Sequence, residues 1–206
     1  LESSLEGIPF AEAAKMSVTV TGQRRLWLEA WVGLYDAGTI KRILRKIFSG
    51  HEGPGGIKHR FQSVPGKRLP QTALLEARNF QQVLEALRGT PWRQALEEPL
   101  KALQHGGGTL FATDLSLDSL ALTRLVRVSR SLSSSRSGTL ADLFGSLADL
   151  ENLLWTIRGF RYFKLGFEDM VNRLLPVRHR LSFDNLRKLG RSRDMEELWQ
   201  HLEQTA

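Results

Sequence analysis

Apolar residues recur along most of the chain at intervals of three, four or seven positions, the spacing that puts side chains on one face of an α-helix. The run from Leu140 to Arg161 is the strongest, with leucines on successive turns. The one β-branched run, Met16 to Thr21, is too short to predict a sheet. The pattern therefore predicts an all-α fold. Helices are expected at about residues 24–49, 71–87, 91–103, 117–132, 140–161, 167–175, 182–189 and 193–203.

Glycine, proline and serine predict where these helices stop. Gly38 indicates a break between two helices inside 24–49, and Thr90 followed by Pro91 is typical of a helix start. The stretch from Gly50 to Gly66 contains five glycines and two prolines. It is predicted to be an exposed loop, and so is the serine-rich segment from Leu132 to Gly138.

A second regularity is that one pattern occurs twice, 113 residues apart. Asp36 and Asp149 each precede an arginine by nine positions, Arg45 and Arg158. Self-similarity at a fixed spacing predicts duplicated helical units that bury their apolar faces against one another. Two further matches keep the same order at nearly the same spacing: Arg68-Leu69 with Arg180-Leu181, and Asn79-Phe80 with Asp194-Met195.

The repeat predicts the domain organisation. The segment from Leu5 to Phe10 resembles that from Leu87 to Trp92, so residues 1–33 are interpreted as the tail of an earlier repeat and a connecting helix. Residues 34–105 form one repeat unit, and residues 106–206 form a second unit with its leading helix. We expect these units to superpose with Asp36 over Asp149.

Composition narrows the function classes. The 206 residues can bury a core without a disulfide or a structural metal, and the absence of cysteine excludes disulfides, zinc–thiolate sites and thiol nucleophiles. No apolar stretch has the roughly 18 to 20 residues that span a membrane, and the start Leu1 to Ser4 lacks the form of a signal peptide. The 29 basic and 22 acidic residues give a net charge of +7, which favours an acidic partner, a nucleic acid or an anionic lipid surface.

Catalytic and metal-binding motifs are missing. The five histidines stand far apart, without an HxxxH or HExxH pair, so no metal site is predicted. The segment from Gly53 to Lys58 lacks the GxxxxGK[ST] pattern of a phosphate loop and is interpreted as a plain surface loop. There is no GxSxG motif and no carboxylate pair with a histidine base. We therefore predict no catalytic residue and no cofactor.

Charged positions are more informative. Arg124, Arg127 and Arg130 lie three apart on a helix whose other face is rich in leucine, so they can form a stripe that binds phosphates or a partner's carboxylates. A solvated helix face is the alternative interpretation and the favoured one. Asp36 and Arg45 are two and a half helical turns apart and cannot pair directly. The repeated aspartate and arginine are therefore expected to join neighbouring units or to cap helix ends.

These residues resemble a known family. Asp149 to Leu153, followed by Arg158, is similar to the D-x-x-N-L…R helix of the C subunit of archaeal and bacterial V-type (A-type) ATPases, which is related to eukaryotic subunit d. Asn152 is the motif asparagine, and Thr39 stands at that position in the first copy. Two further segments resemble the same family: Leu87 to Trp92 its L-x-x-T-P-Y turn, and Arg178 to Ser182 its G-x-x-L-S stretch.

The resemblance implies a funnel of three pseudo-equivalent helical units, the first largely missing here. Such a protein caps the membrane rotor ring, seats the foot of the central stalk and transmits torque for proton or sodium transport. It implies no catalysis, no direct nucleotide binding and a cytoplasmic, peripheral place in the complex. Two other classes remain open: a basic helical nucleic-acid-binding protein, although no recognised binding signature is present, and an enzyme with a site in the loop from Gly50 to Gly66.

Overall fold

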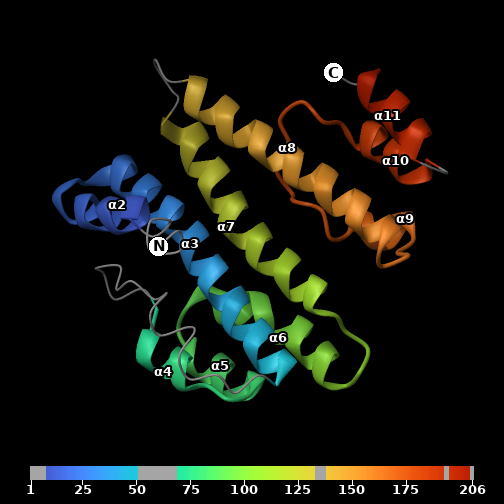
Figure 1. Cartoon of the computed structure of the whole chain (residues 1–206). Helices are drawn as coiled ribbons and strands as arrows, with labels where there is room; N and C mark the ends of the chain where they lie inside the picture. The colour runs from blue at the N-terminus through green and yellow to red at the C-terminus, as the bar shows by residue number, and fades with distance from the viewer. Residues whose placement is uncertain (1–7, 51–68, 133–137, 193–194, 205–206) are drawn as a thin grey trace. The chain divides into compact units, whose positions relative to one another are not determined.

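The computed structural model describes residues 8–50, 69–132, 138–192 and 195–204, and all of the regular secondary structure among these residues is helical (Figure 1). The predicted all-α fold is confirmed. The helices are α2 (Ile8–Thr19), α3 (Gly22–Ser49), α4 (Gln71–Glu76), α5 (Phe80–Ala86), α6 (Pro91–Gln104), α7 (Leu110–Leu132), α8 (Gly138–Arg161), α9 (Phe167–Val171), α10 (Phe183–Arg191) and α11 (Met195–Glu203).

The predicted break at Gly38 is wrong, because α3 runs through this position without interruption. A glycine inside a helix costs only about 1 kcal/mol relative to alanine. The burial of Ala37 and Ile40 on either side outweighs that cost. The β-branched run that begins at Met16 is also helical as far as Thr19, where α2 ends.

The single helix predicted over residues 71–87 is also wrong, since α4 ends at Glu76 and α5 begins at Phe80. Asn79 has an extended backbone, and its side-chain oxygen accepts a hydrogen bond from the Gln82 backbone N–H at 2.9 Å. This contact satisfies one of the free donors at the start of α5 and so favours a new helix there.

The chain forms two compact units, residues 1–128 and 129–206, each with its own core. In the first unit, one face of α3 packs on α4, α5, α6 and α7. Helix α2 covers another face of α3, where the ring centroids of Phe10 and Trp31 lie 5.5 Å apart. The main core consists of fully buried apolar side chains, among them Ile40, Leu44, Leu74, Val83, Leu87, Leu96, Leu100 and Leu117.

In the second unit, α8 packs against α10, which in turn contacts α9 and α11 (Figure 1). Trp155 is the largest fully buried side chain of α8. Gly159 makes room for Met170, because a Cβ atom there would lie 2.1 Å from the Met170 sulfur. Among the described residues of this unit, the other buried apolar side chains are Phe144, Ala148, Leu175, Val177, Leu186, Leu189 and Leu198.

Some predictions concern residues outside the described ranges. The two predicted loops lie there almost entirely, as do Arg68 and Asp194 of the repeat. The division of the chain at residues 33 and 105 rests on the repeat and stays a prediction, as does the superposition of the two copies.

Candidate partner interface

Lys41 and Arg45 of α3 each form an ion pair with α7 within the first unit. Lys41 Nζ lies 2.5 Å from Asp118 Oδ1, and Arg45 Nη2 lies 2.6 Å from Asp114 Oδ2. Each helix contributes residues four positions apart, which lie on one face. The basic residues follow α3 in the direction opposite to the acidic residues along α7, so the two helices pack antiparallel here. The repeated arginine Arg45 therefore meets its acceptor on another helix.

Burial and pairing act in opposite directions on Asp118. Desolvation disfavours its carboxylate and raises its pKa, whereas the nearby ammonium group of Lys41 lowers it. The net effect is a raised pKa, so burial dominates despite the short ion pair. This pair joins α3 and α7 at a specific register rather than contributing a large net stabilisation.

The second repeated aspartate, Asp149, holds a turn of the chain. Its Oδ1 atom accepts a hydrogen bond from the backbone N–H of His179 at 3.0 Å. Its Oδ2 atom accepts hydrogen bonds from the backbone N–H groups of Arg180 at 2.6 Å and Leu181 at 2.9 Å. Hydrogen bonds to a charged acceptor are stronger than neutral ones. Asp149 thus fastens the segment before α10 to the middle of α8.

Asn152 makes a second attachment one turn along α8. It is 0% exposed, and its Oδ1 atom accepts a hydrogen bond from the backbone N–H of Leu175 at 2.7 Å. Its Nδ2 atom is buried and has no hydrogen-bond partner within the described part of the chain. Thr39, at the corresponding position in the first copy, is also buried and accepts a long hydrogen bond from Arg42, 3.5 Å away.

The remaining repeat residues differ in exposure. Asp36 is buried in α3 with 7% of its surface exposed. Arg158 is exposed on α8, nine residues after Asp149. Each aspartate therefore lies toward the interior of its unit, and each arginine lies at a more exposed position.

Two of the three arginines in the α7 stripe already have partners within the chain. Arg124 lies 3.5 Å from Glu29 of α3, and Arg130 donates a hydrogen bond to the backbone oxygen of Arg178 at 2.6 Å. Arg127 is exposed and forms no ion pair or hydrogen bond with another described residue. The three guanidinium groups therefore differ in what they offer a partner.

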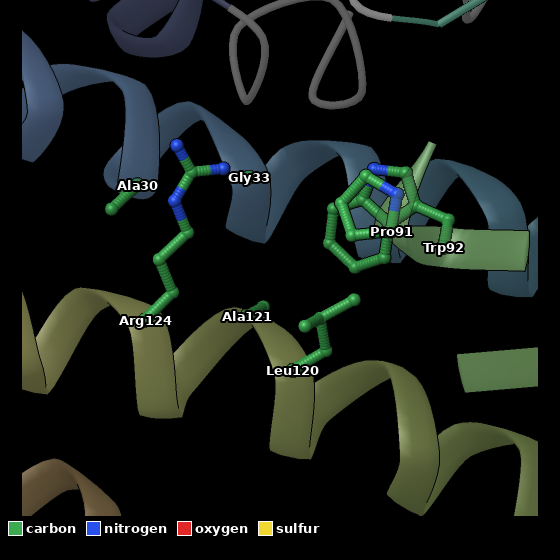
Figure 2. A pocket seen from close by; sticks show the side chains of 7 residues that line it. All are labelled: Ala30, Gly33, Pro91, Trp92, Leu120, Ala121 and Arg124. Carbon is green, nitrogen blue, oxygen red and sulfur yellow. The ribbon is translucent and has the colours of Figure 1, made fainter. Parts of the chain in front are cut away.

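A cavity of about 270 Å³ lies between α3, the start of α6 and α7 (Figure 2). Figure 2 shows the Arg124 side chain rising from α7 toward α3 beside Ala30, while the ring of Trp92 lies near Gly33. The other side chains that line it are apolar, so it provides neither a nucleophile nor a general base. Its lining consists of Ala30, Gly33, Pro91, Trp92, Leu120, Ala121 and Arg124.

Within residues 8–50, 69–132, 138–192 and 195–204, no three His, Asp or Glu side chains gather in a way that could hold a metal ion. No helix among the described residues is long and apolar enough to cross a membrane.

Sequence reasoning did not identify the acidic partners on α7 or the packing of His179. Asp114 and Asp118 carry the spacing of four that matches Lys41 and Arg45, which is the signal that could have found them. His179 packs over Gly145, where a Cβ atom would lie 2.7 Å from its ring. That contact leaves no pattern in the sequence.

The chain was compared with known protein families, curated proteins and solved structures. The family model for the ATP synthase (C/AC39) subunit matches residues 2–206. Searches of curated proteins and of solved structures found no match. The family match covers both compact units and includes every repeat residue discussed above. The chain therefore belongs to the ATP synthase (C/AC39) subunit family, the C subunit family of V-type ATPases.

Proposed function

We propose that this chain is a non-catalytic rotor subunit of a V-type (A-type) ATPase, which couples the central stalk to the membrane proteolipid ring and transmits torque. The observation that carries the proposal is the family match over residues 2–206.

Transmission of torque requires units that do not deform when a force is applied across them. Asp149 and Asn152 bind the backbone at two points of the segment that follows α8, from Leu175 to Leu181. In the first unit, the ion pairs of Lys41 and Arg45 oppose sliding of α3 along α7. Close-packed cores with such cross-links have low compressibility, which supports a mechanical role.

The proposed partners are the central-stalk subunits and the membrane ring, with the chain as a peripheral subunit on the cytoplasmic side. The net charge of +7 favours association with acidic surfaces and mainly increases the rate of encounter. Arg127 is the best placed of the stripe arginines for this purpose, because Arg124 and Arg130 already have partners within the chain.

The test is binding of the full protein to a purified stalk subcomplex and to the detergent-solubilised ring, measured by size-exclusion chromatography and interferometry. We expect binding without added nucleotide and no nucleotide hydrolysis by the protein alone. Failure to bind either partner, together with retardation of duplex DNA at physiological salt, would replace this proposal with the nucleic-acid-binding alternative.

A further inference from the structure

One stripe of α3 faces α7 and, at Gly33, the Trp92 ring of α6. Ala30 and Ala37 are each only 1% exposed, and Gly33 is buried between them. Charged contacts bracket this apolar stripe at both ends. Glu29 pairs with Arg124 of α7 at one end, and Arg45 pairs with Asp114 at the other.

The corresponding stripe of α8 is open. With the 113-residue spacing that relates Asp36 to Asp149, Ala30 corresponds to Leu143 and Ala37 to Leu150. Leu143 is 58% exposed and Leu150 is 49% exposed. Ser146 and Leu154, which fall on the same stripe, are exposed and half-buried respectively. Two exposed leucines thus lie two turns apart on the face of α8 opposite the core of its unit.

The charged positions at the ends also recur. Asp142 stands where α3 has Glu29, and Arg158 stands where α3 has Arg45. The Asp142 side chain is 62% exposed and lies 3.6 Å from His179 Nε2. The open face of α8 therefore has an acid and a base in the order found on α3, with leucines where α3 has Ala30 and Ala37, but Leu154 stands where α3 has Lys41.

We propose that the α8 face formed by Asp142, Leu143, Leu150, Leu154 and Arg158 binds an amphipathic helix of another polypeptide, antiparallel to α8. By analogy with Asp114 and Arg124 of α7, this helix carries a carboxylate that meets Arg158 and, ten residues later, a cation that meets Asp142. Between them it presents small side chains, because leucines on α8 replace the alanines of α3.

A second copy of this chain is a poor occupant. Its own α7 has the required charges, but Asp114 and Arg124 are already paired with Arg45 and Glu29 inside the first unit. The partner is therefore identified by chemistry: a helix with an exposed acid and base ten residues apart that flank alanine or glycine.

The experiment uses a synthetic peptide with the sequence of residues 110–132, carrying Leu117→Ala and Leu120→Ala so that its face is small. Binding to the full chain is measured by fluorescence anisotropy, and a benzophenone at peptide position 121 reports the contact by cross-linking. We expect saturable binding and cross-links to α8. Arg158→Asp should weaken binding about fivefold, the effect of losing a pair worth about 1 kcal/mol.

The charge exchange makes the test specific. A peptide that also carries Asp114→Arg should bind the Arg158→Asp chain more tightly than the wild-type chain. Leu150→Asp should weaken binding more than tenfold while leaving the circular dichroism melt unchanged, since the side chain is already half exposed. Arg173→Asp, which lies outside α8, is the matched charge control and should have no effect. Three results would each overturn the proposal. They are the absence of saturable binding, cross-links only outside α8, and an equal loss of affinity for the Arg158→Asp chain with the peptide that has Asp114 and the peptide that has Asp114→Arg.

Discussion

The Asp149 carboxylate lies 2.6 Å from the backbone nitrogen of Arg180 and thereby joins the middle of α8 to a segment 31 residues further along the chain. Two neighbouring N–H groups bind the same carboxylate. The three bonds set where α10 begins relative to α8. The backbone geometry of residues 179–181 therefore depends on the Asp149 side chain.

Asp149→Ala is expected to lower the free energy of unfolding by about 3 kcal/mol, because it removes a charged acceptor and leaves three backbone donors without it. Asp149→Asn retains one oxygen and should lower it by less. Chemical denaturation followed by circular dichroism measures both. Equal stability of the alanine variant and the wild type would show that water replaces the carboxylate at no cost.

Gly145→Ala should destabilise the protein by about 1–3 kcal/mol, since an added Cβ would lie 2.7 Å from the ring of His179 and force it to move. Gly38→Ala is the matched control. Its added Cβ meets nothing within 4 Å, and alanine is the better helix former, so we expect a gain of about 1 kcal/mol. Thermal melts of the two variants measure the contrast. Two shifts of the same sign would contradict the assigned packing.

Asp118→Asn should change how stability depends on pH. The folded-state pKa of Asp118 is raised by burial, so the folded protein binds its proton more tightly than the unfolded chain does. The contribution of Asp118 to stability is therefore fully present below its unfolded pKa and is lost as the pH rises through the folded pKa.

The measurement is the difference in unfolding free energy between wild type and Asp118→Asn, followed from pH 3 to pH 7. The other carboxylates titrate in both proteins and cancel. We expect the wild type to lose stability relative to the variant as the pH rises. A difference that instead grows in favour of the wild type would mean that attraction to Lys41 outweighs burial.

Charge reversal of the arginine stripe tests partner recognition. Arg127→Glu should slow association with the stalk or ring several-fold at low salt and much less at about 1 M salt, where the Debye length is only about 3 Å. Reversal of Arg124 or Arg130 should also perturb folding, because each is bound within the chain. Arg173→Glu carries the same charge change at an exposed position off α7 and serves as the control. A faster dissociation rate with an unchanged association rate would contradict steering by charge.

Helix boundaries illustrate what local sequence can and cannot specify. The glycine at position 38 predicted a break, but burial of its neighbours keeps α3 continuous. Between Glu76 and Phe80 the periodicity predicted continuity, but the Asn79 cap starts a new helix. In both places the competing energies are about 1 kcal/mol, so a local pattern does not decide between them.

By itself, the sequence determined the all-α class and the family, because helical periodicity and the motif around Asp149 and Asn152 depend only on residues a few positions apart. Only the tertiary structure decided which group each charged residue meets. Arg45 pairs with Asp114, 69 residues away, and Asn152 binds the backbone of Leu175, 23 residues away. Such partners depend on how helices pack after the chain has folded back on itself, and no spacing within one helix encodes them.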